Sequence, residues 1–592
     1  MRRLLLLLFH LVIVGDLCVA QGIESHAISP EPYTRLLRAK GETPEPERLA
    51  AMIAEFQRQQ SPEPVVVRHI HDERAIWRSR SPEQLAQERR ADDALLHAVR
   101  SVNVGPLSAS ARLDRLVLEH AASAMAAGVF RNDDIWPTFH RVRPPFGALP
   151  AQPKTTGDYE NLLAWMRGVP HFLDETRTRL RLAMKAGVIA DRDHVLSAME
   201  ELEAATPASP DESPYLKPFE VMPPEVGEAA AQLRAQAASI YRTRIVPAYA
   251  AHRQFIRDIY LPRARPHGGL AGIPGGRQRY AAMILLHSGS DESAKVIHAS
   301  ARREVERLLG ELTTLARRAG FVGSPDAYLR HLRTMPACGP LDDQAVQERF
   351  NALMADVQRA LPRLFVSVPK TRIELVTGSD VPPAAAGAQA RAGSLREGRA
   401  GQVRLAPVSN ACSLPNVLLH EALPGHLLQY HTLAEFGQVS PFRRAFGSLS
   451  YSEGWAHYAT GLSEELGLRL EPSMRAERVG GEIFMALRAL VDTGIHWYGW
   501  TPERAAQTIR ELAPWVPEQR VLSEVKVAVQ FPARPMTYFV GSQAFSALRV
   551  KEERRGGVGF DVRAFHDRLL KMGPIPAGLL PAAVEIAPAA AR

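Results

Sequence analysis

Apolar residues recur at intervals of three and four along most of this chain, and this spacing places them on one face of an α-helix. Five long stretches show the pattern, with charged residues between the apolar ones: 85–104, 161–187, 224–260, 293–319 and 341–361. Such helices must bury their apolar faces against one another. The sequence therefore predicts a mainly α fold with a large multi-helix architecture.

The longest break between these stretches, residues 378–401, is rich in alanine and glycine. Short segments of alternating polar and apolar residues flank it, at 372–376 and 402–406, and this alternation is typical of β-strands. We expect a small two-stranded ribbon with a mobile tip, close to the candidate active site. The ribbon could offer an edge to an extended peptide, or it could be a structural brace.

The first twenty residues have the pattern of a secretory signal peptide. Arg2 and Arg3 precede a short apolar run, and small residues lead up to Ala20. This run is too short for a comfortable membrane span, and no later segment is long and apolar enough. We expect a secreted or periplasmic protein in which residues 21–585 form one helical domain and 586–592 a tail. The domain could divide into two lobes, at about 21–365 and 366–585.

Cleavage after Ala20 leaves two cysteines, Cys338 and Cys412, which could pair in an oxidising compartment. The 592 residues carry a net charge of +8. Lysine and arginine are dispersed among acidic residues and form no dense run interleaved with aromatic residues. The sequence therefore predicts no nucleic-acid partner. It leaves the oligomeric state open.

The segment HEALPGH at 420–426 is close to a zinc-hydrolase signature. That signature places two histidines four residues apart on a helix so that both bind one metal, with a glutamate beside the first as base. Here His426 follows His420 by six positions, about 240° around a regular helix, so the two rings would face apart. Pro424 and Gly425 lie between them, and both residue types interrupt helices. We predict a two-residue bulge that returns His426 to the metal.

A catalytic zinc site needs a third protein ligand and an open position for water. Glu453 is the best candidate, because a carboxylate buried among aromatic residues requires a cation. Glu421 points about 100° away from His420 around a helix and can reach a metal-bound water, which suits a general base. His431 and His457 lie near these motifs, and we interpret them as packing residues rather than ligands.

Arg488, Asp492 and His496 follow one another at intervals of four, so they share one face of a largely apolar helix. Asp492 could orient a ligating histidine, His496 could hold an oxyanion, and Arg488 could receive a substrate carboxylate. The alternative is a buried ion pair beside a satisfied histidine. Tyr538 could donate its hydroxyl to a tetrahedral intermediate.

Five motifs, taken in order, resemble the bacterial domain-of-unknown-function family 885: HEALPGHLLQ, SEGWAHYA, RALVDTGIHWYGWT, TYFVG and FDVRAFHDRLLKMGPIP. The resemblance covers most of the chain. The family is similar to a divergent branch of the gluzincin metallopeptidases. This resemblance implies a helical fold with one zinc ion bound by His420, His426 and Glu453, and Glu421 as catalytic base. It also strengthens three further site assignments: Asp492, His496 and Tyr538.

The chain departs from the family at Pro532-Ala533-Arg534, where Pro-Gly-Gln is common. If this loop touches substrate, Arg534 would shift the preference toward an acidic group. Tyrosines expected ahead of the first motif are absent from 378–407, which alters the expected binding ribbon. Neither departure involves the expected metal ligands.

These features predict a secreted zinc metallopeptidase that cleaves short peptides, because a site buried among long helices excludes folded proteins. A zinc amidase or esterase acting on a non-peptide or cell-wall fragment would use the same residues. The third interpretation is a non-catalytic periplasmic binding or scaffold protein on the same fold. The four polar groups of the motifs argue against it, because they are costly to bury.

Overall fold

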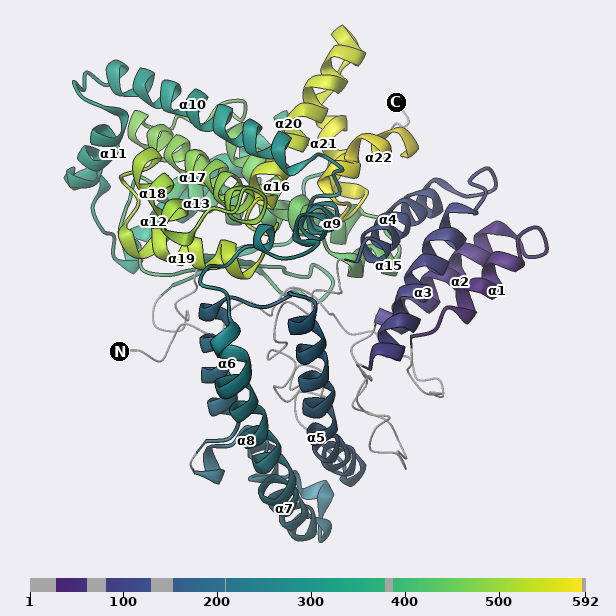
Figure 1. Cartoon of the computed structure of the whole chain (residues 1–592). Coiled ribbons are helices and arrows are strands. Elements are labelled where there is room, and N and C mark those ends of the chain that lie inside the picture. Colours follow the sequence, from purple (N-terminus) through teal and green to yellow (C-terminus); the bar gives the residue numbers. More distant parts are fainter. Residues whose placement is uncertain (1–27, 61–80, 129–152, 208, 378–386, 588–592) are drawn as a thin grey trace. The chain divides into compact units, whose positions relative to one another are not determined.

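The computed structural model describes residues 28–60, 81–128, 153–207, 209–377 and 387–587. Within them the chain is mainly helical with one small sheet, which confirms the expected fold class (Figure 1). Four of the five expected helical stretches are single helices: α3 (Pro82–Arg100), α5 (Thr156–Lys185), α10 (Ala294–Arg318) and α12 (Asp343–Ala360). None of the helices in these ranges is long and apolar enough to cross a membrane. The expected signal peptide, residues 1–20, lies outside the described residues, as does most of the expected tail.

The described chain folds into two compact units. Unit 1 contains Leu107–His120 and the described residues from Tyr280 onward. Unit 2 contains the described residues up to Pro106 together with Ala121–Arg279. Each unit therefore collects separate stretches of the sequence, and neither ends near residue 365, where the sequence suggested a division between lobes.

Unit 2 is built on long helices whose apolar faces form one core. Helix α5 packs against α7 (Ala229–Ile240) and α8 (Val246–Phe255). Trp165 stacks on Tyr215 with ring centres 5.7 Å apart, and the hydroxyls of Tyr215 and Tyr249 share a hydrogen bond of 2.7 Å. The fifth expected stretch, 224–260, is helical from Ala229, with π-helical turns before and after α8.

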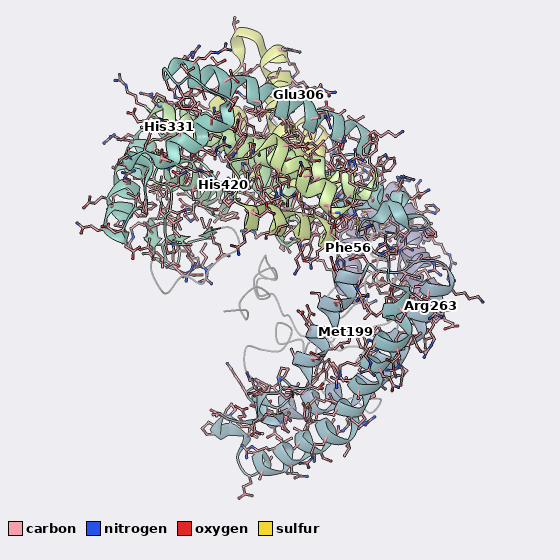
Figure 2. The ribbon with its side chains drawn as sticks, turned by 60° about the vertical axis from the view of Figure 1, so that its left-hand side comes forward. Phe56, Met199, Arg263, Glu306, His331 and His420 are labelled. Carbon is pink, nitrogen blue, oxygen red and sulfur yellow. A yellow bond between two sulfur atoms is a disulfide. The ribbon has the colours of Figure 1, made fainter. Side chains whose placement is uncertain are left out.

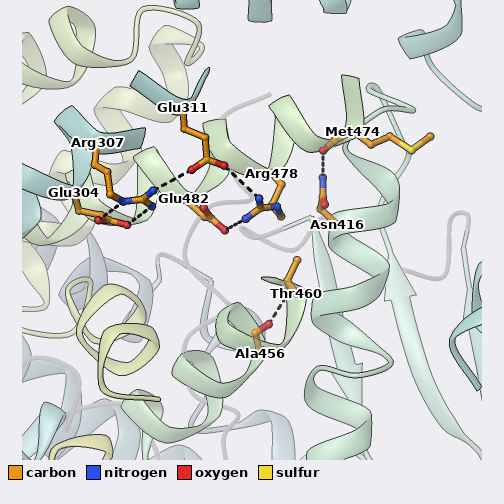
Figure 3. A network of polar contacts seen from close by, with 9 residues as sticks. All are labelled: Glu304, Arg307, Glu311, Asn416, Ala456, Thr460, Met474, Arg478 and Glu482. Carbon is orange, nitrogen blue, oxygen red and sulfur yellow. Dashed lines mark hydrogen bonds and ion pairs between the residues drawn. The ribbon is translucent and has the colours of Figure 1, made fainter. Parts of the chain in front are cut away.

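Unit 1 is organised around α17 (Pro472–His496), whose second half is buried on all sides. Helix α10 packs along α17, and charged residues link the two helices (Figure 3). Arg307 of α10 contacts Glu311, while Arg478 of α17 contacts both Glu311 and Glu482. These side chains are partly exposed, so the network contributes little to stability and mainly fixes how the helices align.

Helices α16 (Leu449–Thr460) and α20 (Thr537–Gly556) cross with their backbones in contact, because each has a glycine at the crossing. A Cβ atom on Gly454 would lie 2.6 Å from the backbone of Gly541, closer than side chains approach. The crossing brings Glu453 of α16 into electrostatic range of Tyr538 of α20.

The sheet has three strands within the described residues, where the sequence predicted two. Strand β1 (Ile373–Val376) pairs in parallel with β3 (Gly401–Leu405), and β2 (Ala388–Arg391) pairs antiparallel with the other side of β3. Both expected strands are therefore present in a small sheet, but they pair in parallel within three strands and do not form a two-stranded ribbon. Strand β2 comes from the stretch that was expected to be a mobile tip, because its four residues, AQAR, carry too few β-forming side chains to indicate a strand.

A disulfide bond joins Cys338 to Cys412 across 74 residues of sequence. Cys412 lies two residues before α13 (Leu414–Glu421), the helix that ends with the first histidine of the HEALPGH segment and its glutamate. The bond limits the freedom of the unfolded chain and ties the segment just before α13 to Cys338.

Candidate metal centre

The HEALPGH segment forms two helices rather than one. Helix α13 ends at Glu421, and α14 (His426–Phe436) begins at His426. The four residues between them are not helical, so the expected interruption is present but is longer than the two-residue bulge predicted from Pro424 and Gly425. The amide of Gly425 donates a hydrogen bond of 3.0 Å to the carbonyl of Leu419, which folds the link back onto the end of α13.

The backbone around position 425 leaves no space for a side chain, so the residue there has to be glycine. A Cβ atom at this position would lie 1.9 Å from the carbonyl oxygen of His420 and 2.6 Å from that of Leu419. No side chain fits between the link and the last turn of α13. Because the chain turns back tightly at Gly425, α14 begins beside the last turn of α13, which carries His420.

Helix α16 is tied to the same link. The indole Nε1 of Trp455, whose side chain is fully buried, donates a hydrogen bond of 3.0 Å to the carbonyl oxygen of Pro424. Glu453 lies two residues earlier on α16. Trp455 therefore sets the position of Glu453 relative to the two histidines of the interrupted motif.

The three expected metal ligands converge. The Nε2 atom of His420 lies 3.4 Å from Oε2 of Glu453, and Nε2 of His426 lies 3.5 Å from the same oxygen. The side chains of His420 and Glu453 are each 17% exposed, and that of His426 is 6% exposed. His420 is labelled in Figure 2. The site is thus largely enclosed.

These distances fit a metal ion. Ligand atoms about 2.1 Å from a tetrahedral zinc ion lie about 3.4 Å from one another. The two measured separations match this value, and they are longer than the usual 2.7–2.9 Å of a charge-assisted hydrogen bond. Two imidazole nitrogens and one carboxylate oxygen are also a donor set that zinc binds in catalytic sites.

His457 joins this cluster, although the sequence led us to interpret it as a packing residue. Its ring centre lies 4.5 Å from that of His420, and one ligand atom from each of His420, Glu453 and His457 lies within 4.8 Å of the other two. His457 follows Glu453 by four residues on α16, so the two side chains share a helix face. That spacing was the signal in the sequence.

Burial and charge act in opposite directions within the cluster. Burial alone would raise the pKa of Glu453, but His426 and His420 hold it well below its ordinary value. Burial would lower the pKa of His426, whereas Glu453 and Glu421 raise it. Burial and the charge of His420 hold the pKa of His457 well below normal. These shifts favour the ionised carboxylate of Glu453 and the neutral imidazole of His457, the forms that bind metal, whereas the pKa of His426 is raised overall, so that a metal competes with a proton there.

Glu421 ends α13 directly after His420 and is partly buried. Its charge acts on His426 and on Tyr430, whose ring stacks on His426 at 5.6 Å between centres. Glu421 therefore lies at the edge of the cluster, close to His426 and Tyr430. Reasoning from the sequence did not identify Tyr430 as part of the site. The available signal was its position four residues after His426 on α14.

Tyr538 lies on the α20 side of the cluster, as the sequence suggested. Its ring centre is 5.8 Å from that of His457, and burial together with the charge of Glu453 raises its pKa to about 12. The Arg488 guanidinium lies 4.2 Å above the same ring. A neutral phenol at this place can donate a hydrogen bond into the site.

Arg488 has a protein partner that the sequence did not indicate. Its Nε atom donates a hydrogen bond of 2.6 Å to Oε1 of Glu524, and both side chains are buried. At this nitrogen Glu524 therefore occupies the place where the sequence suggested a substrate carboxylate. Arg488 instead orients Tyr538 through the contact with its ring.

Asp492 and His496 also have partners away from the metal ligands. Asp492 hydrogen-bonds the Tyr280 hydroxyl at 2.6 Å and accepts the backbone N–H of Ala533 at 3.1 Å. Nε2 of His496 donates to the carbonyl oxygen of Ala528 at 2.8 Å. Asp492 thus orients a tyrosine rather than a ligating histidine, and His496 uses Nε2 inside the core rather than as an oxyanion donor. These contacts position the Ala533 loop that precedes Tyr538.

Arg534 follows Ala533 in that loop. Ala533 has a left-handed backbone with φ of 64°, which turns the chain before α20. The guanidinium of Arg534 lies 5.5 Å from the ring of Phe531, and burial lowers its pKa although the nearby Tyr538 opposes the shift. Arg534 is therefore near Tyr538.

Residues 65–584 match the sequence model of a family described as "Bacterial protein of unknown function (DUF885)". Among solved structures, a "putative lipoprotein" from Colwellia psychrerythraea has a TM-score of 0.71 and 20% identity, covering 94% of this chain and 99% of that chain. A "putative lipoprotein of unknown function" from Shewanella oneidensis has a TM-score of 0.70 and 16% identity, covering 94% of this chain and 100% of that chain. Both likenesses show a shared fold. No curated protein matches the chain.

Proposed function

The chain belongs to the DUF885 family of bacterial proteins of unknown function, and we propose that it is a secreted zinc-dependent hydrolase, a metallopeptidase that cleaves short peptides. The observation that carries the proposal is the placement of two imidazole nitrogens at 3.4 and 3.5 Å from one buried carboxylate oxygen. The expected ligands are His420, His426 and Glu453. The sequence motifs resemble the DUF885 family, and the likeness of that family to gluzincin metallopeptidases implies the same donor set.

A zinc ion held there would polarise a substrate carbonyl and lower the pKa of a bound water to about 7. Glu421, at the end of α13, takes the proton of the attacking water and passes it to the leaving amine. The hydroxyl of Tyr538 donates a hydrogen bond to the substrate oxygen that gains negative charge. The guanidinium of the buried Arg488 packs on the face of the Tyr538 ring and holds the ring in place.

Strand β2 supports a peptide as the substrate class. It forms an edge of the described sheet and packs against α13 and α14, the two helices that carry the histidines. An extended peptide can bind such an edge through its main-chain N–H and C=O groups. This would place a scissile bond near the cluster without requiring particular side chains.

Export of the protein fits two observations. The Cys338–Cys412 disulfide is typical of proteins in oxidising compartments. The two similar solved structures are described as lipoproteins, a class of exported proteins.

Metal analysis of the purified full-length chain tests the proposal directly. We expect close to one equivalent of zinc after mild purification, and loss of this zinc in His420→Ala. Less than about half an equivalent would contradict a one-ion site. The zinc-loaded protein is then incubated with a peptide library, with ester substrates and with muropeptides. Cleavage confined to the esters or muropeptides would contradict the peptidase assignment, and no cleavage of any substrate would contradict the hydrolase.

A further inference from the structure

We propose that His457 is a fourth protein ligand of the metal ion, so that the centre is built from three imidazoles and one carboxylate. The inference rests on the metal centre proposed above and goes beyond its expected ligand set. It follows from the positions of Glu453 and His457, whose side chains lie on the same face of α16.

The candidate donors come in two pairs from different parts of the chain. The interrupted HEALPGH segment supplies His420 and His426 from the adjoining ends of α13 and α14. Helix α16 supplies Glu453 and His457, which are four residues apart and therefore point to the same side. An i, i+4 pair on a helix is the spacing by which one helix chelates one metal.

The link between the helices holds the two pairs together. Trp455 lies between Glu453 and His457 in sequence and is hydrogen-bonded at 3.0 Å to the carbonyl oxygen of Pro424. On the other side, α16 cannot move toward α20 because Gly454 already touches Gly541. The ring of His457 therefore stays near His420, with the ring centres 4.5 Å apart.

His457 has neighbours unlike those of a packing histidine. The buried His566 bonds the Tyr458 hydroxyl at 2.8 Å and the Leu364 carbonyl at 2.9 Å, and His431 accepts the Gly393 amide at 3.1 Å. The groups around His457 are another imidazole, a carboxylate and the ring of Tyr538. Potential ligand atoms of His420, Glu453 and His457 all lie within 4.8 Å of one another.

Four protein donors remain compatible with hydrolysis. Closed four-ligand zinc sites are usually structural, but zinc in catalytic sites can expand to five ligands. A fifth coordination position on the metal would hold the water from which Glu421, as general base, takes a proton. The additional imidazole strengthens metal binding, which suits a protein that has to retain its ion outside the cell.

The test is a count of imidazole ligands in the zinc-loaded, full-length protein by X-ray absorption at the zinc edge. We expect three imidazoles in the unmodified protein and two in His457→Leu. The zinc affinity of His457→Leu should fall at least about tenfold, because removing a residue that only hydrogen-bonds a ligand already lowers metal affinity by about 10–100-fold. The control is His331→Ala on α11 (Pro325–Thr334), an exposed histidine also labelled in Figure 2. It should leave the count at three and the affinity unchanged.

The outcomes separate this inference from the proposed function. Two imidazoles in the unmodified protein, with affinity unchanged in His457→Leu, would overturn the role of His457 and leave the three-ligand zinc centre intact. Failure of the unmodified protein to bind zinc would overturn the zinc centre itself and the fourth ligand with it. The count in the unmodified protein decides the question even if His457→Leu does not fold.

Discussion

The indole N–H of Trp455 donates a hydrogen bond of 3.0 Å to the carbonyl oxygen of Pro424, and this bond joins α16 to the link between α13 and α14. Each element alone carries only part of the candidate metal centre. The helix contributes a carboxylate, and the link determines how the two histidines of HEALPGH face it. Because both partners of the bond are buried, an unpaired carbonyl would cost about 1–3 kcal/mol, so the geometry is strongly favoured.

The link depends on Gly425, so we predict that Gly425→Ala disrupts both folding and metal binding. The new methyl group would lie 1.9 Å from the carbonyl of His420, and the backbone would have to move. We expect a loss of about 2–4 kcal/mol in unfolding free energy and a large loss of zinc affinity. Chemical denaturation and zinc titration measure the two effects.

Gly461→Ala is the matched control, because a Cβ at Gly461 meets nothing within 4 Å and its backbone is right-handed. It should change stability by less than about 0.5 kcal/mol. Equal effects of the two substitutions would contradict the steric role of Gly425.

Glu421→Gln should keep the metal and lose turnover. The amide has nearly the same size as the carboxyl group and leaves His420, His426 and Glu453 unchanged, but it cannot accept a proton. General-base catalysis contributes about 10²–10⁴ in rate, so kcat should fall by that factor while zinc content stays constant. The control is Glu511→Gln on the exposed side of α18 (Pro502–Leu512). Turnover of Glu421→Gln equal to that of the control would remove Glu421 from the mechanism.

Much of the fold, and the outline of the site, follows from local sequence. The apolar spacing located the long helices because one buried face is enough to specify a helix. Pro424 and Gly425 indicated the interruption, since neither residue suits a helix interior. The length of the interruption could not be predicted. It depends on the hydrogen bonds of Gly425 and Pro424 to partners on α13 and α16.

The partners of the buried polar residues could not be read from the sequence. Arg488, Asp492 and His496 do lie on one helix, as their spacing indicated. Their roles are set by contacts at least 32 residues away in sequence, among them Glu524 for Arg488 and the Ala528 carbonyl for His496. The same holds for His457: its spacing from Glu453 was visible in the sequence, but its neighbours on α13 and α20 were not.

The Arg488–Glu524 pair should be far more important for stability than exposed pairs of similar geometry. Glu524→Gln leaves the buried Arg488 charge without a counter-ion, and breaking a buried pair costs about 3–5 kcal/mol. Arg510 and Glu518 make an exposed contact at the same 2.6 Å, where water screens both charges, so Glu518→Gln should leave the unfolding free energy almost unchanged. Urea unfolding of both variants measures the difference. A loss of under 1 kcal/mol in Glu524→Gln would show that water reaches Arg488.

Asp492→Asn should change how stability depends on pH. Burial raises the pKa of Asp492 to about 8, from an ordinary value of 3.8, although the Tyr280 hydroxyl and the Ala533 amide partly oppose the shift. Between these two values the folded chain keeps a proton that the unfolded chain has lost. The contribution of Asp492 to the unfolding free energy therefore falls as pH rises, by about 1.4 kcal/mol per pH unit, and levels off above the folded pKa.

Asparagine is neutral at every pH and can keep both hydrogen bonds, accepting from the Ala533 amide and donating to the Tyr280 oxygen. The stability of Asp492→Asn relative to the natural protein should therefore increase steadily between about pH 5 and pH 8. Urea unfolding at pH 5, 6.5 and 8 gives this difference directly, because contributions from all other groups cancel. A difference that stays constant over the range would mean that the Asp492 carboxyl is already ionised in the folded protein. Its partners would then have to be stabilising a carboxylate, and the loop before Tyr538 would be held by a buried charge.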